Sequence, residues 1–285
     1  MTDSLPQLGS KVGIIAGGGT LPFAVADSLI ARGITPVLFA LKGACDAERV
    51  TAYRHHWLAM GAFGRLLRLL RSEGCRDLVL IGSLVRPSLT SLRLDWGAIR
   101  VLPAVLAAYR GGDDHLLTGV GRLFEGYGFR LLGLKDVATD LLMPEGCLTR
   151  ATADAVVEAD IAKGRALLAA LSPFDIGQGC VVIEGHIVAV EDTGGTDELL
   201  RRVAQLRASG RISARPGRGV LVKAPKAGQD LRFDLPALGP KTIEGLIAAQ
   251  LGGVAVEAGH TVVAEPQAMI AAADRSGLFI VGTRA

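Results

Sequence analysis

The densest group of charged side chains that can act on a phosphate lies in the stretch KAPKAGQDLRFDLP, residues 223–236. If residues 230–235 are extended, their side chains alternate between two faces, and Asp230, Arg232 and Asp234 share one of them. A carboxylate in such a row can hold Mg²⁺ or position a water molecule, while arginine and lysine side chains neutralise phosphate oxygens. A solvated row of surface ion pairs has the same pattern, so the residues alone leave both interpretations open.

A second candidate is the glycine run Gly17-Gly18-Gly19, which separates a strand-like apolar run from a helical pattern. Backbone amides at such a place can bind a phosphate at the N-terminus of the helix, and Pro22 fits the first helical turn. The loop reads GGGTLP instead of G-x-G-x-x-G, and Leu41-Lys42 stands where a dinucleotide site needs a ribose-binding acid. The loop therefore favours phosphate or nucleotide contact over NAD, with a purely structural tight turn as the alternative.

The GGDDH stretch at residues 111–115 pairs glycines with two adjacent carboxylates, Asp113 and Asp114. Two such side chains suit a hard cation that bridges protein and phosphate oxygens. They suit even better the capping of a helix that begins at His115, since an acidic side chain stabilises the first turn.

The EDTGGTD stretch at residues 191–197 precedes another helical pattern. Its amides and the Thr196 hydroxyl are possible phosphate ligands, and Glu191 and Asp197 are possible metal ligands. Helix capping alone would also explain Thr196, so this stretch carries little weight by itself.

Composition excludes several classes of protein. A net charge of +3 without a dense basic run interleaved with aromatics argues against nucleic acid. The four cysteines form no C-x-x-C pair and the five histidines do not cluster, so we predict buried free thiols and no zinc site. The mean hydropathy of +0.38 is high, but no apolar stretch reaches the roughly 18 residues of a spanning helix. With no signal-peptide pattern in residues 1–10, we expect a cytoplasmic protein with at most peripheral contact with the inner face of the membrane.

These candidate residues lie on an alternation of strand and helix patterns. Short apolar runs are typical of buried strands, and apolar residues at helical spacing indicate amphipathic helices. Their alternation in the first half predicts a parallel sheet with helices on its faces. The predicted strands there are 12–16, 36–41, 78–81 and 129–134, and the predicted helices are 21–31 and 62–72.

The pattern changes near residue 143. A long helix at 151–171 and a hairpin at 181–190 follow, and then helix and strand patterns recur to the C-terminus. We therefore predict an α/β fold with two domains: a Rossmann-like parallel-sheet domain at residues 1–142, and a second α/β domain with a mixed sheet at residues 143–285.

Taken together, the motifs resemble those of one family, the LpxI family of UDP-2,3-diacylglucosamine pyrophosphatases. The resemblance spans residues 12–282, and the QDLRFDLPALGPKT core is its most specific part. Ala227 stands where the family pattern leads us to expect proline, and Asp192-Thr193 varies the stretch before GTD, but neither change removes a candidate catalytic group. The motifs that carry the resemblance are IIAGGGTLP, GGDDHLL, AVEDTGGTDELL, KAPKAGQDLRFDLPALGPKTIE and VAVEAGHTVV.

The resemblance implies a hydrolase of lipid A biosynthesis that needs Mg²⁺ or Mn²⁺. Water would attack the pyrophosphate of UDP-2,3-diacylglucosamine at the glucosamine-side phosphorus and give UMP and 2,3-diacylglucosamine 1-phosphate, lipid X. The partner would be this glycolipid nucleotide, and a homo-oligomer is compatible with the sequence. The apolar composition is consistent with a site that accepts two acyl chains.

The family motifs also assign roles to residues. Asp230, Lys223 and Arg232 are the catalytic candidates, and Asp230 is the first candidate for binding the metal, followed by Asp113, Asp114, Glu191 and Asp197. The substrate-binding candidates are Gly17, Gly18, Gly19, Thr20, Leu21, Ser83, Gly195, Thr196, Lys226, Gln229, Lys241 and Thr242.

Two other classes of function stay open. One is a nucleotide-dependent oxidoreductase, which the missing ribose-binding acid disfavours. The other is a non-catalytic protein that binds an acylated sugar, because a deep apolar site suits carriage as well as catalysis.

Overall fold

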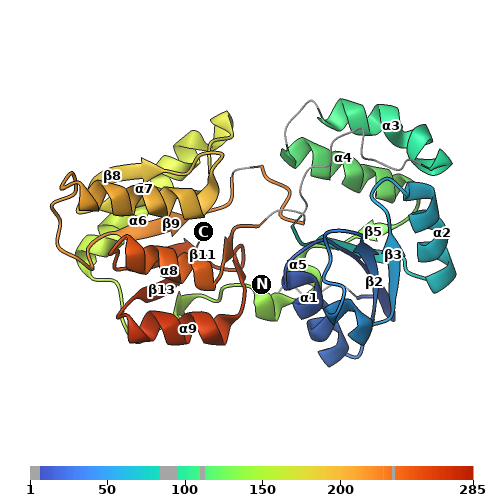
Figure 1. Ribbon diagram of the computed structural model, residues 1–285, viewed down its shortest axis with the longest axis horizontal. Helices are drawn as coiled ribbons and strands as arrows, with labels where there is room; N and C mark the ends of the chain where they lie inside the picture. The colour runs from blue at the N-terminus through green and yellow to red at the C-terminus, as the bar shows by residue number, and fades with distance from the viewer. Residues whose placement is uncertain (1–6, 84–94, 110–112, 227, 233–234, 285) are drawn as a thin grey trace. The chain divides into compact units, whose positions relative to one another are not determined.

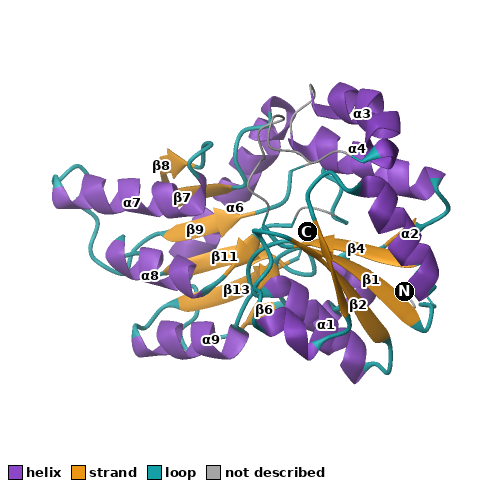
Figure 2. Ribbon diagram, turned by 45° about the vertical axis from the view of Figure 1, so that its right-hand side comes forward, coloured by secondary structure: helices purple, strands orange, loops and turns teal. Residues whose placement is uncertain are grey.

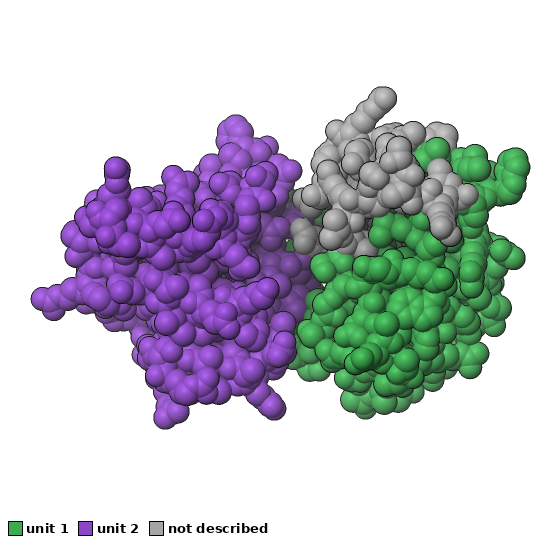
Figure 3. Space-filling model, viewed as in Figure 1, with its two compact units in different colours: residues 1–141, 230–234 green, residues 142–229, 235–285 purple. Residues whose placement is uncertain are grey.

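The computed structural model describes residues 7–83, 95–109, 113–226, 228–232 and 235–284, with only the backbone described at 103–109 and 113–117. The chain forms two compact units, coloured separately in Figure 3. Unit 1 comprises residues 1–141 and 230–234, and unit 2 comprises residues 142–229 and 235–285. The prediction of two contiguous domains did not include the short segment 230–234, which belongs to unit 1 although it lies in the C-terminal half of the sequence.

Unit 1 is built on a five-stranded parallel sheet with the order β3-β2-β1-β4-β5. This is the order of a doubly wound sheet, whose direction of winding reverses between β1 and β4. Its strands are β1 (Lys11–Ala16), β2 (Thr35–Leu41), β3 (His55–Leu58), β4 (Asp77–Ile81) and β5 (Arg130–Leu131). Its helices are α1 (Leu21–Ala31), η1 (Arg49–Ala52), α2 (Phe63–Glu73), α3 (Trp96–Tyr109), α4 (Asp113–Gly126), α5 (Leu134–Val137) and η3 (Thr139–Leu141).

Helices cover both faces of this sheet. Leu66, Leu67 and Leu70 of α2 and Phe124 of α4 pack on one face, and α1 and α5 lie on the other (Figure 1). The helix α2 follows from its sequence, because leucines at helical spacing face the sheet while arginines face solvent, and Gly74 in the left-handed region ends it.

Unit 2 contains a six-stranded mixed sheet with the order β6-β13-β11-β9-β7-β8, in which β9, β11 and β13 are parallel. Its strands are β6 (Gly146–Cys147), β7 (Gly179–Ile183), β8 (His186–Val190), β9 (Val220–Lys223), β11 (Gly253–Glu257) and β13 (Phe279–Thr283), with a separate pair β10 (Ala237–Leu238) and β12 (Val262–Val263). Its helices are α6 (Ala155–Leu171), η4 (Ser172–Phe174), α7 (Gly195–Ala208), α8 (Pro240–Ala248) and α9 (Pro266–Arg275).

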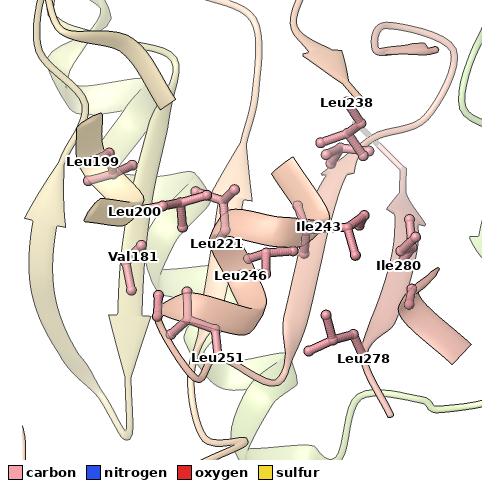
Figure 4. Packing of buried hydrophobic residues seen from close by; sticks show 14 of the residues in the cluster. Val181, Leu199, Leu200, Leu221, Leu238, Ile243, Leu246, Leu251, Leu278 and Ile280 are labelled. Atoms are coloured by element: carbon pink, nitrogen blue, oxygen red, sulfur yellow. The ribbon is translucent and has the colours of Figure 1, made fainter. Parts of the chain in front are cut away.

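The core of unit 2 has two layers. Aliphatic side chains of α7, α8 and α9 pack on one face of the sheet, around Leu200, Leu221 and Leu246 (Figure 4). Val157, Ile161 and other residues of α6 pack on the opposite face (Figure 2). The α/β fold class, with one parallel and one mixed sheet, is therefore confirmed.

Several predicted boundaries were wrong. The helix predicted from residue 151 begins at Ala155, because the Asp154 carboxylate caps it by accepting a hydrogen bond from the Val157 amide at 2.9 Å. The strand predicted at 129–134 is only Arg130–Leu131. The helix predicted to begin at His115 begins at Asp113, so both aspartates are helical residues and not caps.

The extended conformation predicted for 230–235 was also wrong, because Leu231 and Arg232 form a turn. Phe233 and Asp234 lie outside the described residues. Among the described helices, none combines the length and the apolar character needed to cross a bilayer.

Candidate functional site

The carboxyl ends of the parallel strands in unit 2 hold a buried lysine. Lys223 is the last residue of β9, is only 6% exposed and is paired in register with Val256 of the neighbouring strand β11. Its Nζ donates hydrogen bonds to the Thr196 hydroxyl at 2.7 Å and to the Ala237 carbonyl at 3.3 Å. Parallel sheets usually bind ligands at the carboxyl ends of their strands, and the Lys223 ammonium lies at such a place.

A hydroxyl links this lysine to a carboxylate. The Thr196 hydroxyl accepts from Lys223 and donates to Glu191 Oε1 at 3.1 Å, while the Gln178 amide donates to Glu191 Oε2 at 3.3 Å. Thr196 reaches this position because α7 begins at Gly195, whose φ of +76° is a conformation that glycine adopts readily. The structure thus brings together the ammonium of Lys223, the hydroxyl of Thr196 and the carboxylate of Glu191, which are groups that can contact a phosphate or its counter-ion.

Asp197 lies one residue further along α7 and is exposed to solvent. It is an acid in the first turn, where its negative charge interacts favourably with the helix dipole. Its side chain makes no hydrogen bond with the residues that the structure describes, and it is not joined to the Lys223–Thr196–Glu191 group.

Asp230 and Arg232 form a two-pronged ion pair in the segment that belongs to unit 1. Arg232 Nε lies 2.9 Å from Asp230 Oδ1, and Nη2 lies 2.8 Å from Oδ2. The Arg232 amide also donates to Asp230 Oδ1 at 3.1 Å, which closes the turn. Arg232 Nη1 further contacts Glu125 Oε1 of α4 at 2.7 Å, so the segment is fastened to unit 1.

This pairing fixes the charge of both groups. Hydrogen bonds from Arg232 hold the pKa of the Asp230 carboxyl below its ordinary value, against partial burial, which would raise it. The hydrogen bond to Asp230 raises the pKa of the Arg232 guanidinium, and Glu125 adds to this effect. Asp230 is therefore a carboxylate at neutral pH that can accept further hydrogen bonds.

Lys226 and Gln229 shape the loop that follows β9. The Lys226 ammonium forms an ion pair with Asp175. The Lys226 amide donates to Gln229 Oε1 at 3.0 Å, and the Gln229 amide donates back to the Lys226 carbonyl at 3.2 Å. Ala227, the departure from the family pattern, lies outside the described residues.

The glycine loop of unit 1 is held by the loop after β4. Gly18 and Ser83 exchange two backbone hydrogen bonds at 2.8 and 3.0 Å, and the Gly17 amide donates to Ile81 at 2.9 Å. A Cβ on Gly17 would lie 2.7 Å from the Ser83 carbonyl oxygen. The amides of Gly17 and Gly18 are thus already used inside the protein, so their glycines serve the close approach of two loops.

The next three amides differ. Gly19 and Thr20 are exposed, and the amides of Gly19, Thr20 and Leu21 donate to no acceptor among the described residues. They lie at the N-terminus of α1, whose first turn holds no acidic side chain, and at the point where the strand order of the sheet reverses. This arrangement suits an anion such as a phosphate.

Two predicted contacts lie at the start of α8. Thr242 is buried, and its hydroxyl accepts a long hydrogen bond of 3.5 Å from the Gly239 amide, as in a helix cap. Lys241 is exposed at the same helix end. Their described geometry matches helix capping as well as contact with a ligand.

Comparison with known proteins gives consistent matches over most of the chain. The LpxI N-terminal domain matches residues 11–141, and the LpxI C-terminal domain matches residues 144–281. The chain is 39% identical over 272 residues to a Caulobacter vibrioides protein named UDP-2,3-diacylglucosamine pyrophosphatase LpxI, covering 95% of this chain and 97% of that protein.

The chain belongs to the LpxI family. Among solved structures, it aligns with the biotin carboxylase domain of a Hydrogenobacter thermophilus 2-oxoglutarate carboxylase bound to MgADP, ADP and bicarbonate. That alignment has 13% identity and a TM-score of 0.25, and it covers 76% of this chain but only 44% of the other.

The candidate metal ligands of this LpxI-family chain are spread along both units. Among the described residues, no three histidine, cysteine, aspartate or glutamate side chains gather in a group that would hold a metal. Asp113 and Asp114 begin α4, but their side chains are outside the described part. Since Mg²⁺ often uses one or two carboxylates together with water and substrate phosphates, single carboxylates such as Asp230 and Glu191 are compatible with it.

One pair of polar residues was missed by the sequence analysis. Glu257 ends β11, one residue after Val256, which is the register partner of Lys223, and its Oε1 lies 2.5 Å from Nδ1 of His260. Both side chains are largely buried at the same edge of the sheet. The signal was present in the VAVEAGH stretch, where a glutamate directly follows an apolar strand and a histidine lies three residues later.

Proposed function

We propose that this chain hydrolyses UDP-2,3-diacylglucosamine to 2,3-diacylglucosamine 1-phosphate and UMP, as a step in lipid A biosynthesis. The observation that carries the proposal is the 39% identity to a relative named for this activity, in an alignment that covers 97% of that relative. Water adds to one phosphorus of the pyrophosphate, and the bond from that phosphorus to the bridging oxygen breaks.

In this proposal, Lys223 and Arg232 bind and stabilise the phosphate oxygens. Lys223 is suited to this role because its ammonium is buried and held by Thr196, so it need not reorganise when charge develops. Arg232 is held rigid by Asp230 and Glu125. A guanidinium fixed in this way holds its positive charge at a defined position.

Asp230 is the proposed carboxylate that orients the attacking water or holds the metal ion. Its lowered pKa keeps it ionised, and an ionised carboxylate accepts hydrogen bonds from water. The exposed amides of Gly19, Thr20 and Leu21 are the proposed contact of unit 1 with a phosphate of the nucleotide.

We further propose that the enzyme needs Mg²⁺ or Mn²⁺. The oxygen-rich donor set of Asp230 and Glu191, without a histidine or cysteine group among the described residues, suits hard cations. Such an ion would neutralise phosphate charge and lower the pKa of a bound water. Asp113, Asp114 and Asp197 remain secondary candidates.

The protein is proposed to act in the cytoplasm with peripheral contact with the membrane. The substrate named for the relative carries two acyl chains, and hydrophobic chains of that kind reside in a bilayer.

The decisive experiment incubates the purified chain with UDP-2,3-diacylglucosamine in detergent micelles and follows both products by mass spectrometry. Formation of UMP and 2,3-diacylglucosamine 1-phosphate in equal amounts supports the proposal. Reactions in H₂¹⁸O locate the attack, and label in the lipid product means attack at the glucosamine-side phosphorus. The requirement for a metal is tested by adding EDTA. Turnover should stop in EDTA and return when excess Mg²⁺ is added.

The same assay separates the alternatives. A non-catalytic carrier would bind the substrate without releasing UMP. An oxidoreductase would show a change in nicotinamide fluorescence on mixing and no UMP. Either result contradicts the hydrolase proposal.

A further inference from the structure

The first turn of α3 exposes two large apolar side chains. Trp96 is 84% exposed and Ile99 is 47% exposed. They are three residues apart on one helix and so lie on the same side of it. An exposed tryptophan forgoes a burial that would stabilise the fold, so such a patch often marks a surface that contacts another apolar phase.

This turn is held in place by a single carboxylate that caps two helices. Asp95 accepts from the Gly64 and Arg65 amides of α2 at 3.0 and 2.9 Å and from the Ala98 amide of α3 at 2.8 Å. Gly97 approaches Gly64 so closely that a Cβ at 97 would lie 2.5 Å from the Gly64 Cα. The N-termini of α2 and α3 are thus held together, and Trp96 directly follows the aspartate that binds the Arg65 amide.

The surface around Trp96 carries unpaired positive charge. Leu66, Leu67 and Leu70 of α2 face the sheet, which leaves the three arginines of that helix exposed. None of Arg65, Arg68, Arg71 and Arg100 forms an ion pair with a residue that the structure describes. Exposed arginines elsewhere are of both kinds. Arg202, Arg211 and Arg215 of unit 2 have no carboxylate partner among the described residues, whereas others form the pairs Arg54–Glu73, Arg130–Asp77, Arg150–Asp274 and Arg284–Glu145.

We propose that this α2–α3 surface, made of Trp96, Ile99, Arg65, Arg68, Arg71 and Arg100, docks on an anionic lipid bilayer. Tryptophan is favoured at the boundary between lipid and water, and arginines next to it are attracted to anionic headgroups. We choose an anionic bilayer over a polyanion such as a nucleic acid because two apolar side chains, Trp96 and Ile99, lie beside the charges. A bilayer has an acyl region that such side chains can enter. In this choice the inference rests on the proposed function, whose substrate carries acyl chains.

The test measures sedimentation of the full chain, without substrate, with vesicles of phosphatidylcholine alone or mixed with phosphatidylglycerol. Binding should require phosphatidylglycerol and weaken with salt. Replacing Arg65, Arg68 and Arg100 by glutamine should weaken binding on the order of 100-fold, since each basic residue near an anionic surface contributes about a factor of five. Trp96→Ala should weaken it about tenfold.

Matched controls keep the test specific. Arg202, Arg211 and Arg215 of unit 2 are exposed, and their replacement by glutamine removes the same net charge. Phe174→Ala removes an aromatic ring that is 71% exposed in unit 2. Both controls should bind like the parent, and circular dichroism should show that every variant is folded.

Fluorescence gives an independent readout. The chain has two tryptophans, so Trp57→Phe leaves Trp96 as the single reporter. Its emission should shift to shorter wavelength on vesicles that contain phosphatidylglycerol.

Two results of the vesicle assay would overturn the proposal: no binding to anionic vesicles, or an equal loss of vesicle binding in the unit 2 control variants. Binding to single-stranded DNA, a polyanion without an apolar phase, but not to the vesicles would overturn it as well. Because substrate is absent from these measurements, hydrolysis in micelles can succeed while docking fails, and the reverse also holds.

Discussion

The Asp230 carboxylate accepts hydrogen bonds from Nε and Nη2 of Arg232. Each carboxylate oxygen can accept more than one hydrogen bond, so the group can also bind water or a metal ion. A surface ion pair and a working carboxylate therefore look alike in the free protein. The two differ in what a substitution costs, because a partly exposed ion pair contributes little to stability whereas a group positioned for catalysis contributes much to the rate.

We predict that Asp230→Ala lowers kcat by roughly 10²–10⁴-fold, the range for a positioned acid–base group. The side chain is 21% exposed, so the stability cost should be only about 0–1 kcal/mol. Steady-state kinetics and thermal unfolding measure the two effects. Asp274→Ala, which removes the partner of Arg150 in unit 2, is the control. A folded Asp230→Ala enzyme within threefold of the parent rate would contradict the assignment. Asp234, the other acid of the motif, lies outside the described residues.

The lowered pKa of Asp230 leads to a prediction about pH. Activity that needs the carboxylate is lost as pH falls through its pKa, and Arg232 holds that pKa below the ordinary value of about 4. In Arg232→Gln the pKa should return towards that value, so the acidic limb of kcat/KM should move to higher pH although the rate itself falls. Profiles between pH 3 and 7, within the range where circular dichroism is unchanged, check this. A limb at the same pH in both enzymes would mean that another group titrates.

Lys223 is a stronger candidate for charge stabilisation than its sequence context suggested. Lys223→Met keeps most of the length of the side chain and removes the ammonium, and we expect kcat to fall by about 10²–10³-fold. Thr196→Val should weaken activity because it removes the hydroxyl that holds Nζ, whereas Thr196→Ser should retain it. Lys163→Met, which removes an exposed lysine that contacts the Gly185 carbonyl, serves as the control. Equal kinetics of the Lys223 and Lys163 variants would refute this role.

At the scale of elements, the periodicity of apolar residues predicted most strands and helices. Side chains that face the core recur every two residues in a strand and every 3.6 residues in a helix. It failed at 230–235, where alternating residues suggested a strand. There the Asp230 side chain accepts from the Arg232 amide two residues later, and this local hydrogen bond stabilises a turn instead.

The glycine loop shows the same limit for the site. Its position between β1 and α1 could be read from the sequence, but the use of the Gly17 and Gly18 amides could not. Their partners are Ile81, the last residue of β4, and Ser83 in the loop after it, both more than 60 residues away, and only the sheet brings these segments together. The same holds for Lys223, whose hydrogen-bond partner Thr196 precedes it by 27 residues.

This distinction predicts different costs for two glycines of one loop. Gly17→Ala would place a Cβ 2.7 Å from the Ser83 carbonyl oxygen, so backbone must move, and we expect a loss of about 1–3 kcal/mol in the free energy of unfolding. At Gly19, φ is +87° and a Cβ would meet nothing within 4 Å, so only the strained conformation costs energy, roughly 1 kcal/mol. Denaturant unfolding of the two variants measures the difference. An equal or larger loss for Gly19→Ala would contradict the close approach as the reason for glycine at 17.

At the scale of the whole molecule, the chain passes between the two units three times: after Leu141, after Gln229 and after residue 234. The second and third passages enclose a segment of five residues that carries two of the three catalytic candidates. Contiguous domain boundaries read from sequence miss such a segment, because neither composition nor periodicity marks it. Its place depends on contacts such as Arg232 with Glu125, and these join residues 107 positions apart.

If the placement of this segment in unit 1 matters for activity, then Glu125 should influence the rate although it has no chemical role. We predict that Glu125→Gln lowers kcat/KM two- to fivefold, which corresponds to the contribution of up to about 1 kcal/mol from a partly exposed ion pair. Because Glu125 acts through Arg232, the double variant Glu125→Gln/Arg232→Gln should be no slower than Arg232→Gln alone.

The control is Glu145→Gln, which breaks the exposed pair with Arg284 in unit 2 and should leave kcat/KM unchanged. Thermal unfolding should place all four proteins within a few degrees of the parent. If the effects of the two substitutions multiply in the double variant, Glu125 acts on the rate by a route other than Arg232. If Glu125→Gln has the parent rate, the fastening of the segment to α4 has no part in catalysis, and Asp230 and Arg232 must be positioned by the turn alone.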